Sequence, residues 1–528
     1  MIIRSNHPGV NVPETSVTEF LFGELTPEDA PRLAITDAAT DRGYTYAELI
    51  HAIDRIASAL AERGFGHGDV AALVTENCIE YASIFYGVLQ SSGVISPANP
   101  LYTPSELAYQ LHDCGARIVF ASSAALNSVR TAVEDGRTSV EEIVVIGPVD
   151  GSGSVRETEL ADFITTMAPS VRARPAAEDL AVLPYSAGTT GLPKGVMITH
   201  RNLIAGVLQG HSFAQLDSDS TVLAALPLFH IYGITLIMSQ CLHSRGRLVT
   251  LPRFDFTRFL EVIERHRINS LFIAPPIAIA LVKHPLVDQY DLSSVEFVLC
   301  AAAPLDGQLA HALGKRLDVH VLQAYGMTET CPGISGVPLG RTDIDLGSVG
   351  VLLPNIEARV VDPETGKDVG AGERGELWCR GPNVMGGYLN NPAASAAALD
   401  GDGFLHTGDI VTADSDGVFR VVDRLKELIK YKGYQVAPAE LEAVILAHPG
   451  INDAAVIGVT DDAGQEVPKA FVQRSATRPD LDADEVINFV AERVAPYKKI
   501  RLVEFIDSIP KSPAGKILRR ELRGREGE

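Results

Sequence analysis

The sequence is poor in aromatic residues and lacks paired cysteines. Phe, Trp and Tyr make up 6% of the 528 residues, so the interior must be filled chiefly by Ala, Val, Leu and Ile. The six cysteines are scattered along the chain, and no Cys-x-x-Cys pair occurs. This spacing argues against a structural zinc site or a disulfide framework and fits a reducing compartment.

Long apolar runs and an excess of positive charge are also missing. The run at 270–282 is too short to span a bilayer and contains Pro275 and Pro276. The first residues lack the basic-then-apolar order of a signal peptide, and the final Arg-Glu-Gly-Glu is no peroxisomal signal. The net charge of −22 argues against nucleic-acid binding, so an anionic substrate would need local positive charge. We expect a cytoplasmic protein with no integral membrane segment.

The length and the hydrophobic pattern predict an α/β protein of at least two domains. Short apolar runs, such as 70–74 and 143–146, alternate with longer segments of helical periodicity, which predicts parallel sheets covered by helices. Strand and turn patterns at 347–380 predict a small β subdomain, whereas 147–180 reads as a looser connection. We place a large N-terminal domain at 1–423 and a small, mobile α+β lid domain at 424–528.

Several helix boundaries can be read directly from the residues. Thr45 with Glu48, and Thr103 with Glu106, have the spacing of capping boxes, and proline follows Thr103 at the first helical position. Periodicity predicts further helices at 80–90, 438–447 and 483–494.

The chemistry is concentrated in residues 185–200, which read Tyr-Ser-Ala-Gly-Thr-Thr-Gly-Leu-Pro-Lys-Gly-Val-Met-Ile-Thr-His. Glycines let backbone N–H groups approach an anion, threonine hydroxyls can donate to phosphate oxygens, and Lys194 supplies a mobile charge. Such a loop suits a triphosphate. It is not the P-loop of kinase-like NTPases, because Lys194 is followed by Gly195 rather than by Ser or Thr. The alternative is a flexible surface loop that merely contains polar residues.

This loop resembles the phosphate-loop signature of the adenylate-forming enzymes, which include acyl-CoA synthetases, peptide-synthetase adenylation domains and beetle luciferases. Further motifs follow in the family's order: Tyr-Gly-Met-Thr-Glu at 325–329, His-Thr-Gly-Asp at 406–409, Asp423-Arg424 and a loop around Lys516. The resemblance therefore covers nearly the whole chain. It is strongest to the group of 4-coumarate–CoA ligases and luciferases.

The resemblance implies a binding site for ATP and Mg²⁺. Glu329 becomes the Mg²⁺ ligand, since hard carboxylate oxygens suit this ion. Thr328 contacts the α-phosphate, and Gln323 and Tyr325 lie by the nucleotide. Asp409 and Arg424 contact the ribose. The phosphates are held by residues of the loop, namely Ser186, Ala187, Gly188, Thr189, Thr190 and Lys194.

The resemblance also implies two tasks for the C-terminal domain. Lys516 bridges the substrate carboxylate and the α-phosphate during adenylation, whereas Lys430 and Gln435 serve catalysis. Lys426 is the hinge residue about which the lid rotates after pyrophosphate leaves. The residues implied to contact coenzyme A (CoA) are Lys432, Gly433 and Arg253.

These assignments predict an ATP-dependent acid–CoA ligase. The acid is already ionised at neutral pH, so forming the acyl-adenylate requires positioning and charge neutralisation rather than a general base. His230 becomes a gate beside the acyl pocket. The pocket segments at 230–235, 299–303, 323–324 and 331–333 are mostly apolar, which predicts an apolar aryl or fatty acid.

The particular acid and the acceptor stay open. Plant coumarate ligases have lysine where this chain has Leu299 and glycine where it has Ala324. Both differences argue against taking 4-hydroxycinnamate as the substrate, and a fatty or unsubstituted aryl acid fits as well. The enzyme could instead load the phosphopantetheine of a carrier protein. The sequence is also compatible with a luciferase-like oxygenase and with a non-catalytic adenylate-binding protein.

Overall fold

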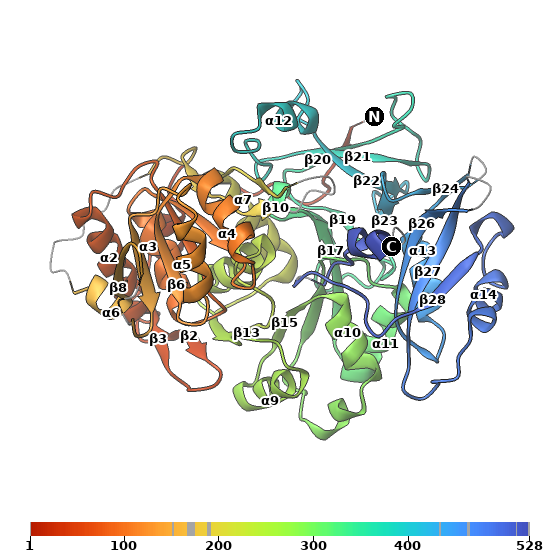
Figure 1. Cartoon of the computed structure of the whole chain (residues 1–528), viewed down its shortest axis with the longest axis horizontal. Helices are drawn as coiled ribbons and strands as arrows, with labels where there is room; N and C mark the ends of the chain where they lie inside the picture. Colours follow the sequence, from red (N-terminus) through yellow and green to blue (C-terminus); the bar gives the residue numbers. More distant parts are fainter. Residues whose placement is uncertain are drawn as a thin grey trace.

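The computed structural model describes residues 2–149, 151, 153–165, 175–186, 192–431, 434–461, 465–513 and 515–525, with only the backbone of Tyr434 and Gln435. Two large sheets and a smaller antiparallel sheet form the N-terminal part, and a separate α+β domain follows (Figure 1). The predicted α/β architecture is confirmed. No helix within the described ranges is long and apolar enough to cross a membrane.

The first large sheet has seven strands in the order β12-β9-β5-β4-β6-β7-β8. All neighbours are parallel except β12 and β9. The strands are β4 (Val70–Val74), β5 (Val94–Ala98), β6 (Ala116–Ser122), β7 (Glu142–Ile146), β8 (Arg156–Glu159), β9 (Leu180–Val182) and β12 (Ile198–Thr199).

The second large sheet has nine strands in the order β19-β18-β17-β16-β15-β13-β14-β2-β3. It is parallel from β2 to β17 and antiparallel at both edges. The strands are β2 (Leu33–Asp37), β3 (Gly43–Thr45), β13 (Thr221–Ala224), β14 (Arg247–Thr250), β15 (Ser270–Ile273), β16 (Phe297–Cys300), β17 (His320–Gly326), β18 (Gly333–Gly336) and β19 (Val351–Leu352).

Helices cover the faces of both large sheets (Figure 1). One hydrophobic core joins Leu73 and Phe120 of the first sheet to Leu223 and Phe272 of the second. The helices of the N-terminal part are α1 (Val17–Phe22), α2 (Tyr46–Glu62), α3 (Glu80–Gln90), α4 (Pro104–Cys114), α5 (Leu126–Glu134), α6 (Leu160–Phe163), α7 (His200–Ala214), α8 (Gln240–His243), α9 (Phe256–His266), α10 (Pro275–Lys283), α11 (Gly307–Leu317) and α12 (Pro392–Ala398), with a π-helix at Gly233–Ser239 and 3₁₀ turns at Pro285–Gln289 and Thr328–Thr330.

The β subdomain predicted at 347–380 contributes two strands, β20 and β21, to a five-stranded antiparallel sheet in the order β1-β20-β21-β22-β23 that extends beyond this range. The last two strands of this sheet bring Asp409 opposite Arg424. The predicted boundary at 423/424 falls at the end of β23 and stays a prediction. The strands are β1 (Ile3–Arg4), β20 (Glu357–Val361), β21 (Arg374–Arg380), β22 (Leu405–Ala413) and β23 (Phe419–Arg424).

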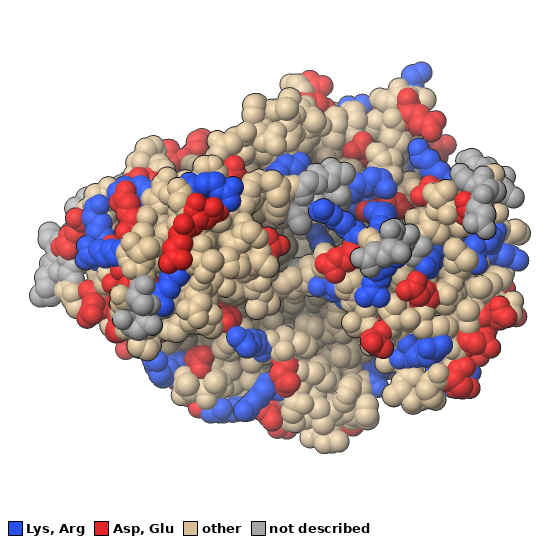
Figure 2. All heavy atoms as spheres, in the orientation of Figure 1, with Lys and Arg blue, Asp and Glu red and all other residues tan. Residues whose placement is uncertain are grey.

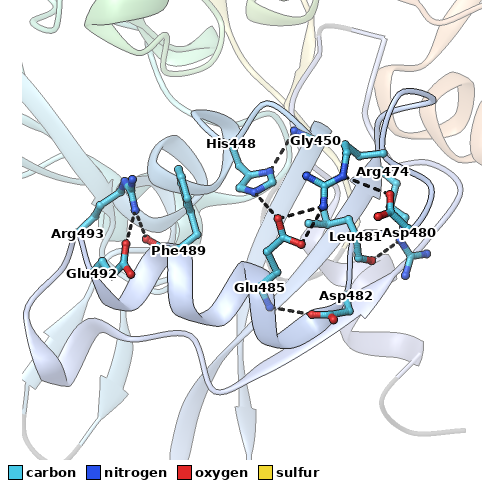
Figure 3. Close-up of polar contacts among 11 residues, drawn as sticks. His448, Gly450, Arg474, Asp480, Leu481, Asp482, Glu485, Phe489, Glu492 and Arg493 are labelled. Carbon is cyan, nitrogen blue, oxygen red and sulfur yellow. Dashed lines mark hydrogen bonds and ion pairs between the residues drawn. The ribbon is translucent and has the colours of Figure 1, made fainter.

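The C-terminal domain packs helices against a three-stranded sheet, β26-β27-β28, and a two-stranded ribbon, β24-β25. Polar contacts fix its outer helix α14 (Ala483–Ala491), where Asp482 caps the first turn and His448 Nε2 lies 3.5 Å from Glu485 Oε1 (Figure 3). The Arg478 guanidinium donates to both Glu485 oxygens. The other elements are β24 (Ile429–Tyr431), β25 (Tyr434–Val436), α13 (Pro438–Leu446), β26 (Ile451–Thr460), β27 (Glu466–Arg474), a 3₁₀ turn (Pro496–Lys498), β28 (Leu502–Phe505) and α15 (Arg519–Gly524).

Some predicted elements need correction. The looser connection at 147–180 contains β8 and α6, which are each four residues long and therefore too short to show a clear periodicity. The helix expected at 483–494 ends at Ala491. Both predicted capping boxes form, at Thr45 and Thr103.

Candidate active site

The phosphate loop is framed by two very short paired strands, β10 (Tyr185–Ser186) and β11 (Lys194–Gly195). Their antiparallel register places Ser186 opposite Lys194. Four of the predicted phosphate ligands, Ala187, Gly188, Thr189 and Thr190, lie outside the described residues. The frame is anchored by the Tyr185 hydroxyl, which donates to Asp113 Oδ2 at 2.7 Å.

Tyr388 links the phosphate-loop lysine to the predicted metal ligand. Lys194 Nζ lies 4.4 Å from the centre of the Tyr388 ring. The Tyr388 hydroxyl donates to Glu329 Oε1 at 2.9 Å, and Glu329 is only 5% exposed. Burial and the Glu329 carboxylate raise the pKa of Tyr388, which therefore keeps its proton as a donor. Sequence reasoning missed Tyr388, which lies outside the recognised motifs.

Asp409 is buried at the centre of a polar group. The Tyr325 hydroxyl donates to Asp409 Oδ2 at 2.6 Å, and Arg424 Nε lies 3.4 Å from Oδ1. Burial raises the pKa of Asp409, and the charge of Arg424 together with the Tyr325 hydrogen bond opposes this shift. The structure thus brings together three residues that the sequence assigns to the nucleotide.

The loop bearing Lys516 lies against the large domain. Gly515 has φ +79°, and a Cβ added to it would lie 3.3 Å from Ala274 Cβ and 3.2 Å from Pro276 Cδ, at the start of α10. Burial lowers the pKa of Lys516, and the positive charge of Arg424 lowers it further. The carboxylates of Asp409 and Glu329 act on Lys516 in the opposite direction. The charges that act on Lys516 are therefore those of residues predicted to bind the nucleotide and Mg²⁺.

His230 belongs to the same neighbourhood. Burial, aided by the nearby charge of Lys516, lowers the pKa of His230 to about 4, so the ring is neutral at physiological pH. A neutral ring beside a lysine suits the predicted place at the entrance of an acyl pocket, because it adds no charge there.

Other predicted residues take up separate positions. Lys430 is exposed on β24, opposite Gln435 in the ribbon, and its backbone N–H donates to Glu466. Lys432 and Gly433 lie outside the described residues. Arg253 is exposed and 3.4 Å from Glu76 Oε1.

Three further predicted residues, Lys426, Thr328 and Gln323, lie in or next to strands and turns of the large domain. Burial lowers the pKa of Lys426, which follows β23. Thr328 opens the 3₁₀ turn that also holds Glu329. The Gln323 amide nitrogen donates to the carbonyl of Leu305 at 3.0 Å and to that of Leu346.

A cavity of about 30 Å³ lies where the acyl pocket is expected. Gln323, Ala324, Leu299 and Gly333 belong to predicted pocket segments. The segment 230–235 contributes none of its lining; Leu236 takes this place, within a π-helix that the pattern did not reveal. The remaining lining residues are Gly206, Gly210, Phe213, Gln240, Ser335, Gly336, Val337 and Leu353.

The space-filling view shows a hollow between the large domain and the C-terminal domain (Figure 2). Lys and Arg side chains gather along its edge on the side of the C-terminal domain, although the chain as a whole carries a net charge of −22. Local positive charge of this kind favours the approach of anionic substrates.

The phosphate-loop signature in the sequence, the contacts of Asp409 with Tyr325 and Arg424, and the packing of the Lys516 loop against the large domain all agree with an adenylate-forming enzyme. The chain belongs to the AMP-binding enzyme family: the family model matches residues 25–389, and the model of the AMP-binding enzyme C-terminal domain matches residues 440–516. It is an enzyme of the AMP-forming acid–CoA ligase class.

Relatives of known activity cover the whole chain. A 4-coumarate–CoA ligase of Pinus taeda is 38% identical over 99% of this chain and 97% of its own length. The 4-coumarate–CoA ligase 3 of Oryza sativa subsp. japonica is 39% identical over 99% and 95%.

Solved structures show the same fold. ATP-bound MatB from Rhodopseudomonas palustris superposes with a TM-score of 0.87 at 30% identity and covers 98% of this chain and 99% of that protein. The anthranilate CoA ligase AuaEII, in complex with anthranoyl-AMP, reaches 0.90 at 26% identity and covers 98% of each chain.

Proposed function

We propose that this enzyme joins an aryl or fatty acid to CoA, using ATP and Mg²⁺, through an acyl-adenylate. The observation that supports this most is the position of Lys516. Its loop packs against Ala274 and Pro276 of the large domain, and the charges of Arg424, Asp409 and Glu329 act on its ammonium group.

In the first step, Lys516 would neutralise charge between the acid and the α-phosphate. Attack by a carboxylate on a phosphate brings two anions together, and a fixed ammonium group lowers the cost of their approach. Burial strengthens this interaction, because water screens it less. Thr328 and Lys194 would hold the phosphates from the other side.

The described residues offer Mg²⁺ one protein ligand, and substrate phosphates would complete its coordination. Glu329 offers one buried carboxylate, oriented by the Tyr388 hydroxyl. No cluster of three or more His, Cys, Asp or Glu that could hold a metal occurs in the described part of the chain. Mg²⁺ is commonly held by one or two carboxylates together with substrate phosphates, and bound there it would neutralise phosphate charge.

The ribose would bind at Asp409. Each carboxylate oxygen has two lone-pair positions, so Asp409 can accept from sugar hydroxyls while it keeps the contacts to Tyr325 and Arg424. Tyr325 and Gln323, on β17, would line the base.

In the second step, the C-terminal domain would turn about Lys426, near the proposed boundary at 423/424. Lys516 would leave the site, and Lys430 with Gln435 would enter it. The exposed position of Lys430 on β24, while Lys516 is inserted, supports this division of tasks. Lys432, Gly433 and Arg253 are the proposed CoA contacts.

The test uses purified enzyme with ATP, Mg²⁺, CoA and a panel of hydroxycinnamic, benzoic and fatty acids, with acyl-adenylate and acyl-CoA measured separately by mass spectrometry. We expect acyl-CoA from at least one acid. Lys430→Ala should still form acyl-adenylate but little acyl-CoA, whereas Lys315→Ala, an exposed lysine on α11, should match the wild type. Adenylate without thioester in the wild type would indicate a carrier protein as acceptor. If neither acyl-adenylate nor acyl-CoA were formed from any acid, the proposal would be contradicted.

A further inference from the structure

Two polar side chains in the wall of the cavity expected to hold the acyl group have no hydrogen-bond partner among the described residues. Neither the nitrogen nor the oxygen of the Gln240 amide makes a hydrogen bond to a described residue, and the same holds for the hydroxyl of Ser335. Gln240 is 0% exposed and Ser335 1%. Both residues line the cavity, whose other walls include Phe213, Leu236 and Leu353.

Unpaired buried polar groups of this kind are rare, because burial removes their hydrogen bonds to water. The other glutamine of the cavity, Gln323, shows the ordinary case, since its amide nitrogen donates to two backbone carbonyls. Gln240 differs because its donor and its acceptor are both unused. Its amide is therefore available to a molecule that enters the cavity.

The surrounding backbone is shaped to hold the Gln240 amide at this place. Gln240 directly follows the π-helix Gly233–Ser239, a type of local distortion that is frequent at functional sites. On the facing helix α7, a Cβ on Gly210 would lie 3.1 Å from Gln240 Oε1 and 2.4 Å from the Leu236 side chain. With Leu236 and Gln240 in their present positions, a Cβ at position 210 would crowd both side chains.

We infer that Gln240 and Ser335 determine which acid is accepted by binding a neutral, hydrogen-bonding substituent at the end of its tail. The Gln240 amide both donates and accepts, so a carboxamide or a hydroxyl complements it, with the Ser335 hydroxyl as a second contact. No charged side chain is among the described residues that line the cavity, so a charged substituent would be unfavourable there.

This inference rests on the proposed acid–CoA ligase activity and narrows its substrate class. The expected apolar tail becomes a mostly apolar tail with one polar end. The cavity of about 30 Å³ has room for the end of such a tail rather than for a whole acid, so the remainder must lie towards Ala324 and the nucleotide site.

The experiment compares matched pairs of aryl acids. One member of each pair has a hydroxyl or a carboxamide at the end of its tail, and the other has hydrogen there. We expect the wild type to prefer the polar member of at least one pair by about 100-fold or more in kcat/KM, because the apolar analogue leaves buried polar groups unpaired. In Gln240→Met, which keeps length but removes both hydrogen-bonding atoms, this ratio should fall towards one, mainly through KM for the polar acid.

Two further variants make the result decisive. Ser335→Ala should reduce the same ratio less strongly, and it provides a second test if Gln240→Met does not fold. Gln209→Met is the matched control, because Gln209 is equally buried but donates to the carbonyl of Pro354 and does not line the cavity. Its ratio should equal that of the wild type.

The outcomes separate this inference from the proposed function. The inference would be overturned if both members of every pair gave acyl-CoA equally well, or if Gln240→Met and Ser335→Ala left the ratio unchanged. Water would then occupy the polar end of the cavity. Either result would leave the ligase activity intact. Failure to activate any acid would instead contradict the proposed function.

Discussion

Lys516 is the residue on which the first half-reaction should depend most. Its partly buried ammonium group lies near two carboxylates, Asp409 and Glu329, and near Arg424. Lys516→Ala should therefore lower acid-dependent pyrophosphate release by about 10²–10³-fold, the usual cost of removing one preorganised electrostatic contact. The hydrolysis of a supplied acyl-adenylate or its transfer to CoA should change much less. An equal loss in both steps would contradict a role confined to adenylation.

Tyr388 should act through Glu329 rather than on the substrate. Tyr388→Phe keeps the ring beside Lys194 but removes the hydroxyl that donates to Glu329. The Mg²⁺ concentration for half-maximal activity should rise about 10-fold, as is usual when a partner of a metal ligand is lost. Tyr388→Leu, which also removes the ring, should in addition raise KM for ATP. An unchanged Mg²⁺ dependence in Tyr388→Phe would contradict this positioning role.

His200 should make the fold sensitive to acid. Burial lowers the pKa of His200 to about 4 from 6.5, and its Nδ1 accepts from the backbone N–H of Val17 at 3.2 Å. Between pH 6.5 and 4 the unfolded chain binds a proton at this residue and the folded chain does not. The free energy of unfolding should therefore fall on acidification, by up to about 3 kcal/mol once the pH is below 4.

The matching variant is His200→Asn, which offers an acceptor but does not titrate. Thermal unfolding measured from pH 7 to pH 4.5 should show a shallower loss of stability in this variant. Parallel curves for the two proteins would contradict the assignment.

At the scale of single elements, the N-cap of α14 allows a prediction about the stability of the C-terminal domain. Asp482 accepts from the N–H of Glu485 at 2.8 Å at the outer side of the C-terminal domain (Figure 3). Asp482→Ala should destabilise this domain by about 1 kcal/mol, and Asp482→Asn should retain most of the stability. Hydrogen exchange of α14 would measure both effects, and acid activation should stay unchanged.

The sequence predicted those elements whose signals are local. The capping boxes at Thr45 and Thr103 and the buried strand 70–74 depend on neighbouring residues, and the structure contains all three. The π-helix at 233–239 could not be predicted, because its residues are buried throughout and mostly apolar, and such a run does not distinguish one helix type from another. For the same reason the pocket segment was expected at 230–235, whereas Leu236 and Gln240 line the cavity.

The site residues divide in the same way. Asp409 and Arg424 were both assigned to the ribose from their motifs, and the structure pairs them on two adjacent strands; their role stays a prediction. Tyr388 and Gln240 were missed, since their roles arise only when distant segments meet at Glu329 and at α7. A glycine at 210 inside a helical pattern was the one available signal for the second of them.

At the scale of the whole molecule, the contact between the two domains offers a way to hold the enzyme in one arrangement. A Cβ on Gly515 would lie 3.3 Å from Ala274 Cβ, close to the mean separation of about 3.8 Å in disulfides. The double variant Ala274→Cys with Gly515→Cys should therefore form a cross-link on oxidation. The six native cysteines are free and mostly buried, so they should compete little.

The cross-linked enzyme should complete the first half-reaction and fail in the second. Lys516 would be held near Asp409 and Glu329, so acyl-adenylate should form in a single turnover. The positive φ of Gly515 disfavours a side chain at this position, so adenylate formation should be slower than in the wild type. Lys430 could not reach the site, so acyl-CoA should appear only after reduction of the disulfide. The single variants, treated with the same oxidant, should make acyl-CoA throughout. If the cross-linked enzyme made acyl-CoA at the rate of the single variants, both steps would proceed in the domain arrangement of this structure. The role assigned to Lys430 would then be wrong.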